Sequence, residues 1–382
     1  MADQALPSQR YLFNIPDDVT YLNCANMSPQ LRSVSAAGEV SVRGKEHPWD
    51  TRPQDWFTGV ERLRALAGQV FGTSPENIVL VPSVSYGMAV AAANVRVEKG
   101  QKIVFPDKEF PSNYHAWNLK ARREGAEFQI VQRGEDGDWT RAILNAIDNR
   151  TAVVSVPNCH WTDGGLFDLV QIGEAARHVG AALVIDASQS LGAHPLPIDI
   201  VQPDFLMAVG YKWLLGPYAL GYLYVSPKWH AGTPLEDSWI NRAGSEDFSG
   251  LVDYEEKYRP GARRYDMGES SNFVLVPMAQ AALQQVLAWG IGTIRQRTSA
   301  LTTRIDDEAE TLGISVVPRQ YRIDHLIGLR FPQGVPATLP AALAASRIAV
   351  SIRGDAIRVA PHVYNTEDDI EVLFRAIRSV LG

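Results

Sequence analysis

The chain has 382 residues, of which 46% are hydrophobic and 21% are charged, as in an ordinary globular protein. Its net charge of −7, with no basic cluster, argues against nucleic acid or an anionic membrane as a partner. The sequence has no apolar run long enough to span a bilayer and no secretion signal, and its cysteines, Cys24 and Cys159, form no CxxC motif. We therefore expect a cytoplasmic protein without a metal site or a disulfide framework.

The middle of the chain alternates between strand-like and helical segments. Short β-rich runs predict strands over residues 77–81, 102–105, 127–131, 152–156, 182–185, 205–208 and 221–225. Apolar periodicity predicts helices over residues 62–71, 86–95, 113–124, 140–147 and 169–178. Strands that alternate with helices in this way are typical of an α/β fold, so we expect a mostly parallel seven-stranded sheet between helices.

The C-terminal part has a different pattern. Residues 231–260 are rich in Gly, Ser, Asp and Glu and predict an irregular crossover, and residues 277–312 predict a long helix interrupted near Gly290 and Gly292. Strands are predicted over residues 325–331, 348–352 and 357–359, before a final helix over 366–380 that Thr366 would cap. We expect a smaller α+β domain formed by residues 1–16 and 259–382, beside a large domain over residues 17–258.

Lys212 is the only cation in an otherwise apolar run from Phe205 to Gly216. An unpaired ammonium in such surroundings would cost several kcal/mol, unless the amine is neutral or covalently used. A second apolar run ends at Asp186. A lysine and an aspartate at two strand ends are the pair that a pyridoxal 5'-phosphate (PLP) enzyme needs. The lysine forms the Schiff base, and the aspartate keeps the pyridine nitrogen protonated.

Seven segments in order resemble the class V aminotransferase group of the PLP-dependent fold type I superfamily. This group also contains cysteine desulfurases, kynureninases and isopenicillin N epimerase-like enzymes. The resemblance extends from about residue 21 to the C-terminus and implies PLP as cofactor, a small amino acid as substrate and a homodimer. The segments are residues 21–26, 82–87, 109–113, 160–164, 186–189, 210–217 and 357–365.

The resemblance also assigns residues to the cofactor phosphate and ring. The backbone around Val84 and Ser85, with the Ser85 hydroxyl, would bind the phosphate at a helix N-terminus, although Ser83 and Ser85 could equally be helix caps. Tyr211 matches a position whose side chain reaches the same phosphate. Phe110 matches the position whose ring stacks on the pyridine in kynureninase-like members, where desulfurases use histidine.

Further cofactor contacts are implied on the other side of the ring. Gln189 matches a residue that hydrogen-bonds the phenolic oxygen, and Asn158, which also follows a strand, is either a cofactor contact or a turn residue. Thr162 is expected to line the substrate side of the ring. Ser270 and Ser271 match a loop that approaches the neighbouring subunit's phosphate in this family.

The substrate side is expected to contain an arginine for the α-carboxylate, because a planar guanidinium pairs with a carboxylate through two hydrogen bonds. Arg358 lies in an Arg-Val-Ala-Pro segment that matches kynureninase-like members. Arg353 fits the desulfurase pattern better and is our second choice. Asn26 and Trp161 are the remaining substrate-side candidates.

The residues leave the reaction open among several classes. Desulfurases need a nucleophilic cysteine just before the C-terminal strands, but residues 351–356 contain none, and Cys24 and Cys159 are elsewhere in the sequence. Residues 160–163 also lack the pattern that we would expect of kynureninase. We therefore expect an aminotransferase of class V type. A lyase or epimerase is the alternative among enzymes, and a protein that binds PLP without turnover is the alternative outside them.

Overall fold

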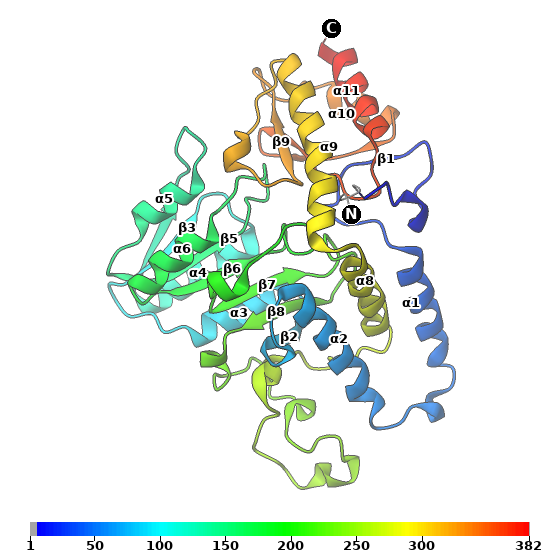
Figure 1. Ribbon diagram of the computed structural model, residues 1–382. Helices are drawn as coiled ribbons and strands as arrows, with labels where there is room; N and C mark the ends of the chain where they lie inside the picture. Colours follow the sequence, from blue (N-terminus) through cyan, green and yellow to red (C-terminus); the bar gives the residue numbers. More distant parts are fainter. Residues whose placement is uncertain (1–5, 382) are drawn as a thin grey trace, which may run out of the picture.

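A seven-stranded sheet forms the centre of the computed structural model, which describes residues 6–381 (Figure 1). The strand order is β2-β8-β7-β6-β5-β3-β4, and only β8 runs antiparallel to its neighbours. The mostly parallel seven-stranded sheet predicted from the sequence is confirmed. The strands are β2 (Ile78–Val81), β3 (Lys102–Pro106), β4 (Glu127–Val131), β5 (Thr151–Pro157), β6 (Ala182–Asp186), β7 (Phe205–Val209) and β8 (Gly221–Val225).

Helices cover both faces of this sheet. Side chains alternate between the two faces along each strand, so apolar strands give the sheet two apolar faces that must be buried. In β2, Ile78 and Leu80 pack in one hydrophobic cluster, whereas Val79 and Val81 pack in another. The first cluster includes side chains from α2 (Asp55–Phe71), α5 (Trp139–Ala146), α6 (Leu169–His178) and α8 (Leu275–Trp289). The second includes side chains from α3 (Val84–Asn94) and α4 (Pro111–Glu124).

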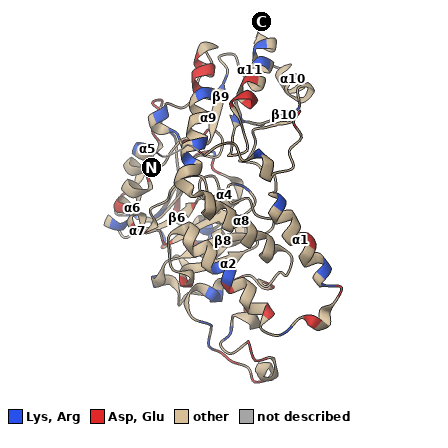
Figure 2. Cartoon of the chain, turned by 45° about the vertical axis from the view of Figure 1, so that its right-hand side comes forward, with Lys and Arg blue, Asp and Glu red and all other residues tan. Residues whose placement is uncertain are grey.

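Helix α1 (Arg32–Gly44) was not expected from the sequence. Only Val34 and Gly38 are buried along it, and Val40 and Val42 are exposed, so α1 contributes few side chains to the core. Figure 2 shows basic and acidic residues interspersed along α1, α9 (Ile291–Thr311) and α11 (Glu367–Leu381).

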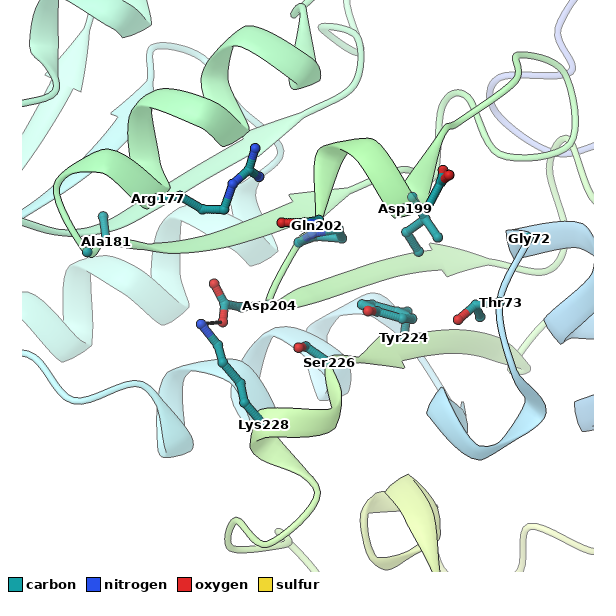
Figure 3. A pocket seen from close by; sticks show the side chains of 13 residues that line it. Gly72, Thr73, Arg177, Ala181, Asp199, Gln202, Asp204, Tyr224, Ser226 and Lys228 are labelled. Atoms are coloured by element: carbon teal, nitrogen blue, oxygen red, sulfur yellow. Dashed lines mark ion pairs between the residues drawn. The ribbon is translucent and has the colours of Figure 1, made fainter.

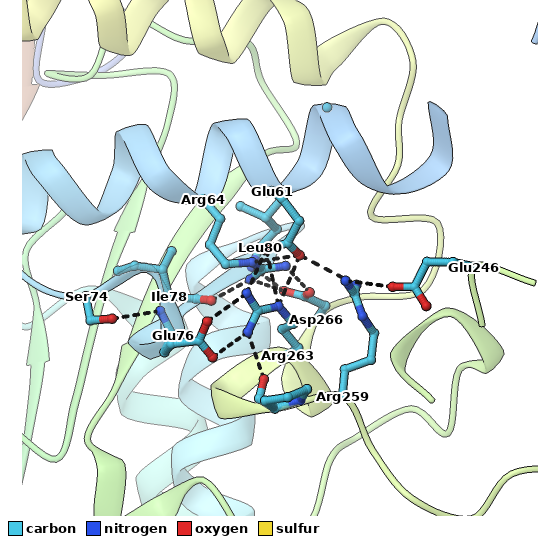
Figure 4. Close-up of polar contacts among 12 residues, drawn as sticks. Glu61, Arg64, Ser74, Glu76, Ile78, Leu80, Glu246, Arg259, Arg263 and Asp266 are labelled. Atoms are coloured by element: carbon cyan, nitrogen blue, oxygen red, sulfur yellow. Dashed lines mark hydrogen bonds and ion pairs between the residues drawn. The ribbon is translucent and has the colours of Figure 1, made fainter. Parts of the chain in front are cut away.

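A buried ion-pair network covers the edge strand β2 (Figure 4). Arg64 on α2 is fully buried and pairs with Asp266, which follows the irregular crossover. The same carboxylate accepts a hydrogen bond of 2.7 Å from the N–H of Leu80 in β2. Arg263 adds an ion pair with Glu61 on α2. The segment after the sheet is thereby fixed to α2, and it occupies part of the edge where another strand could pair.

Residues 291–381 lie above the central sheet in the view of Figure 1. The antiparallel sheet in this part has the order β11-β12-β9, and β1 pairs with β10 in parallel. The long predicted helix is two helices, α8 and α9, separated at Gly290, whose φ of 78° lies in the left-handed region. The elements are β1 (Thr20–Tyr21), α9 (Ile291–Thr311), β9 (Ile327–Arg330), α10 (Leu339–Ala345), β10 (Ile348–Ala349), β11 (Ser351–Arg353), β12 (Ala356–Val359) and α11 (Glu367–Leu381).

The division into domains at residues 16/17 and 258/259 stays a prediction. Helix α8 packs against α1 and α2, whereas α9, α11, β9 and β12 share a hydrophobic cluster with Leu22 from the N-terminal region. Residues 231–260 contain short 3₁₀ helices, turns and bends, and no α-helix or extended strand. The short helix α7 (Ile198–Val201) precedes β7. Within residues 6–381, no helix combines the length and the apolar character needed to cross a membrane.

Candidate active site

A pocket lies at the edge of the central sheet where the parallel strands β5, β6 and β7 end. Ligands of open α/β sheets gather at such carboxyl ends because the connecting loops meet there. Asp186 is the last residue of β6, and Lys212 lies in the loop after β7. The pocket is lined by Val84, Glu109, Phe110, Pro157, Cys159, Trp161, Asp186, Ser188, Gln189, Val209, Tyr211 and Lys212.

Lys212 is a buried amine with little compensation from neighbouring groups. Its side chain is 8% exposed, and its Nζ lies 5.7 Å from the centre of the Phe110 ring and 5.8 Å from that of Tyr211. The lysines that form ion pairs within residues 6–381 are Lys102, Lys120 and Lys228, and Lys212 is not among them. Burial lowers the pKa of Lys212 to about 8, although the charge of Asp186 opposes this shift. The share of neutral, nucleophilic amine near neutral pH is therefore larger than for an exposed lysine.

Asp186 is held in place by hydrogen bonds from both sides. Its Oδ2 accepts a bond of 2.8 Å from the side-chain amide of Asn113, in the first turn of α4, and its Oδ1 accepts one of 2.9 Å from the N–H of Ser188. These two donors fix the orientation of the carboxyl group. Sequence reasoning gave Asn113 no role, although it belongs to one of the seven segments.

Glu109 is a second buried acid in this pocket, and sequence reasoning missed it. Its Oε1 accepts a hydrogen bond of 2.6 Å from the N–H of Phe110, whereas its Oε2 finds no partner among the described residues. Burial and the negative charge of Asp186 raise the pKa of Glu109 to about 8. The pocket therefore contains one carboxyl group that favours its neutral form beside another that is stabilised by two donors.

The N-terminus of α3 borders the pocket at Val84. Ser83 is the N-cap, since its hydroxyl accepts a hydrogen bond of 3.2 Å from the N–H of Tyr86. Ser85 is exposed, and no described residue bonds to its hydroxyl. The first N–H groups of an α-helix have no partner inside the helix, and the helix dipole favours an anion there. This end of α3 offers the groups that a phosphate needs, with Tyr211 in the same pocket lining.

Phe110 is a large apolar residue that remains exposed at the pocket, with 39% of its surface accessible. It meets Trp161 edge to face, with ring centres 5.6 Å apart. Trp161 in turn donates a hydrogen bond of 2.8 Å to the carbonyl of Lys108. An exposed aromatic face above a buried lysine is an arrangement that suits a flat ligand stacked in the pocket.

Three further residues were predicted to contact the cofactor, and of these Gln189 lines the pocket, whereas Asn158 and Thr162 do not. The amide of Gln189 donates to the Ala25 carbonyl (3.0 Å) and accepts from Trp213 (3.0 Å), so its predicted contact with a phenolic oxygen would use its remaining N–H. Asn158 is buried, and its Oδ1 has no partner among the described residues. The Thr162 hydroxyl lies 2.7 Å from a ring nitrogen of His160 and does not line the pocket.

Ser270 and Ser271 lie outside the pocket lining, and they are buried within this chain at 2% and 6% exposure. Their predicted position near the phosphate of a neighbouring subunit stays a prediction.

The two cysteines, Cys24 and Cys159, are far apart in the sequence, but both lie near Lys212 in the structure. Cys159 lines the pocket, and its thiol lies 3.5 Å from the Gln189 carbonyl. Cys24 is fully buried within range of the charges of Lys212 and Arg358. Burial raises the pKa of both thiols well above the usual range, so both stay protonated. Their position keeps desulfurase activity open as an alternative, whereas their protonation makes them poor nucleophiles.

The four predicted substrate-side residues are brought together. Arg358 on β12 is 1% exposed and donates a hydrogen bond of 2.9 Å to the Trp161 carbonyl. The guanidinium of Arg353 on β11 lies 5.7 Å from the centre of the Trp161 ring and 3.4 Å from Oδ1 of Asn26. Burial and the charge of Arg353 lower the pKa of Arg358 to about 10. Trp161, which lines the pocket, therefore connects both guanidinium groups to it.

A second hollow lies at the opposite edge of the sheet, where β6 and β7 begin (Figure 3). Lys228 points toward Asp204 and pairs with it, and Arg177 donates a hydrogen bond of 2.6 Å to the Val201 carbonyl. Because the protein itself satisfies these basic groups, this hollow offers no free cation or nucleophile comparable to Lys212.

The residues at the carboxyl edge fit PLP. The pocket offers a buried amine for its aldehyde, a fixed carboxylate for its ring nitrogen, an exposed aromatic face for its ring and a helix N-terminus for its phosphate. The buried Oε2 of Glu109, which lines the pocket, also lacks a partner among the described residues, as expected for a site that holds a polar ligand.

Comparison with known proteins gives the family. The model of the family described as "Aminotransferase class-V" matches residues 48–373. The chain is 24% identical over 359 residues to the uncharacterized aminotransferase YcbU of Bacillus subtilis (strain 168), with 88% of this chain and 90% of that protein covered. It is 27% identical over 350 residues to a probable cysteine desulfurase of Methanothermobacter thermautotrophicus, with 84% and 83% covered.

A solved structure supports the fold. The cysteine desulfurase from Thermococcus onnurineus NA1 matches all of this chain and is itself fully covered, with a TM-score of 0.87 at 20% identity. Because the family match covers most of the chain, the protein is an enzyme rather than a silent binding protein. The chain belongs to the class V aminotransferase family of PLP-dependent fold type I enzymes.

Proposed function

We propose that this enzyme is an aminotransferase that acts at the α-carbon of an amino acid, with Lys212 holding the cofactor. The observation that carries the proposal is the buried, unpaired amine of Lys212 in the same pocket as the fixed carboxylate of Asp186. The absence of cysteine from residues 351–356 and the similarity to YcbU favour amino-group transfer over desulfuration.

Each part of the cofactor has a residue to hold it. Lys212 would bind the aldehyde, Asp186 would keep the ring nitrogen protonated, and the N–H groups of Val84 and Ser85 with the Ser85 hydroxyl would bind the phosphate. Phe110 would stack on the ring. When bound, PLP withdraws electrons from the α-carbon of the amino acid attached to it.

Asn113 and the backbone of residue 188 position the Asp186 carboxylate. Glu109, which favours its neutral form, avoids a second negative charge beside Asp186. A single ionised carboxylate at this position suits a protonated pyridine nitrogen better than two would.

Once the amino group of the substrate has replaced it on the aldehyde carbon, Lys212 would be free to act as the base for the α-proton, because its pKa is lowered to about 8. A base whose pKa lies near the working pH is partly deprotonated and still accepts a proton readily. The planar guanidinium of Arg358 would bind the α-carboxylate through two hydrogen bonds and so orient the α-proton toward Nζ of Lys212.

A labelling experiment tests amino-group transfer. The enzyme is incubated with amino acids labelled at the amino nitrogen and with an unlabelled 2-keto acid, and the label is followed by mass spectrometry. Label in the amino acid formed from the keto acid supports the proposal. Label released as ammonia indicates a lyase, and inversion at the α-carbon without transfer indicates an epimerase; either result contradicts it. The Lys212→Ala variant should be inactive, whereas Lys99→Ala, at an exposed position, should retain full activity.

We further propose a homodimer in the cytoplasm. In the dimer, Ser270 and Ser271 would approach the phosphate of the second subunit. Light scattering tests the oligomeric state, and a monodisperse monomer with full activity would contradict the proposal.

A further inference from the structure

Arg353 and Arg358, the two substrate-side arginines, lie on the same face of the antiparallel sheet β11-β12-β9. Strands β11 and β12 are antiparallel, and Arg358 is directly opposite Ser351. Arg353 lies two residues beyond Ser351 on the same strand, so its side chain projects to the same side. Residues in this diagonal relation have Cβ atoms about 7–8 Å apart. Two side chains as long as arginine can therefore both contact one ligand.

Neither guanidinium has an acidic partner within residues 6–381. The other three buried arginines of this part of the chain are all ion-paired: Arg64 with Asp266, Arg263 with Glu61 and Arg322 with Asp306. Arg358 is as buried as these but bonds only to a carbonyl, and the Nε atoms of both Arg358 and Arg353 are buried without a partner. A buried, unpaired cation is costly, so its retention points to an anion that arrives from outside.

Neighbouring acids do not supply that anion. Asp163, which packs against β9, pairs with Arg133 and Arg330, and Asp355 in the β11–β12 turn also pairs with Arg330. Among the described residues, Arg358 donates only to the Trp161 carbonyl, and Arg353 donates to the Ile352 carbonyl (2.9 Å) and to Asn26. Both positive charges therefore stay unneutralised and repel each other at the border of the pocket. One α-carboxylate would neutralise only one of these charges.

We propose that the substrate carries a second carboxylate at the end of its side chain. Arg358, the deeper of the two, binds the α-carboxylate, and Arg353 binds the second carboxylate together with the amide of Asn26. This inference rests on the proposed site for the α-carboxylate and specifies the substrate as an acidic, dicarboxylic amino acid. It does not depend on which reaction follows binding.

Calorimetric titration of the holoenzyme with unreactive acids tests the inference. Succinate and glutarate are compared with propionate and butyrate, which lack the second carboxylate and, without an amino group, cannot react. We expect the dicarboxylates to bind at least about tenfold more tightly, because each additional charge-assisted pair contributes that much. Equal affinities, or no measurable binding of the dicarboxylates, would overturn the proposal.

Variants assign the two carboxylates. Arg353→Gln should reduce dicarboxylate affinity to that of the monocarboxylates and leave monocarboxylate affinity unchanged, and Arg353→Lys should recover part of the loss. Arg358→Gln should weaken both classes. Arg304→Gln, which removes an exposed ion pair with Glu371, is the control and should change neither.

An Arg353→Gln variant that loses both classes equally, while its circular dichroism shows a folded protein, would contradict the assignment. Binding is measured without turnover. The affinities can therefore be interpreted even if the labelling experiment shows no amino-group transfer.

Discussion

Replacing Lys212 with methionine should stabilise the cofactor-free protein at neutral pH while abolishing activity. Methionine keeps the length and apolar character of the side chain but removes the ammonium group. In the folded chain that group is buried between Phe110 and Tyr211 without an ion-pair partner among the described residues. Removing an uncompensated buried charge relieves a desolvation penalty.

The pKa of Lys212 gives the size of the effect. It falls from 10.5 to about 8 on folding, chiefly through burial. This difference corresponds to about 3 kcal/mol by which the charged form destabilises the fold below pH 8. Between pH 8 and 10.5 the unfolded chain binds a proton that the folded chain does not. The wild-type protein therefore gains stability as the pH rises through this window, and the penalty is absent above it.

Urea unfolding at pH 7 and at pH 10.5 measures the effect. The advantage of Lys212→Met over wild type should be about 3 kcal/mol larger at pH 7 than at pH 10.5. Taking the difference between the two pH values removes any constant gain or loss from methionine packing. The control variant is Lys99→Met, at an exposed position, for which the free energy of unfolding relative to wild type should not change with pH.

A stability difference between Lys212→Met and wild type that is the same at both pH values would refute the reasoning. It would show that the amine is well solvated in the folded protein, in which case it would have neither the lowered pKa nor the role of base that we assign to it.

Three further predictions concern neighbouring groups. The pKa of Glu109 is raised to about 8, so the folded chain binds a proton that the unfolded chain releases above pH 4.5. Wild type should therefore lose stability between pH 5 and pH 8 relative to Glu109→Gln, and parallel urea stability curves for the two would contradict this. Arg64→Met should lower the free energy of unfolding by about 3–5 kcal/mol because Asp266 is left buried without its partner, and a loss below about 1 kcal/mol in urea unfolding would argue against the network. Phe110→Ala should weaken PLP binding about fivefold or more through lost stacking, and Phe110→Leu should weaken it less. Fluorescence titration with PLP checks this, and unchanged affinity in both variants would exclude stacking by this ring.

Much of the sheet could be predicted from the sequence because its strands are buried on both faces. Such strands form short continuous apolar runs, and a charged residue that ends one stands out, as Asp186 does after β6. Lys212 is equally visible because no other charge lies near it in the sequence. Helix α1, which was not predicted, differs from these strands in that most of its residues are exposed and only Val34 and Gly38 are buried.

The sequence does not show which loop residues lie close together in the folded chain. Cys159 and Cys24 are far apart in sequence, yet both lie near Lys212 because β5, β7 and the N-terminal region meet at one edge of the sheet. Glu109 reads as an ordinary loop acid, and only the fold shows that it is buried beside Asp186. Arg353 and Arg358 could be proposed only as alternatives, whereas the register of β11 and β12 places both on one face.

The most direct test of the account is to locate the covalent attachment of PLP. The purified holoenzyme is reduced with borohydride and digested, and the peptide that carries the cofactor is sequenced by mass spectrometry. We predict a single modified residue, Lys212, and no modification in the Lys212→Met variant. Attachment at any other lysine, or a modified peptide that persists in that variant, would contradict the central claim.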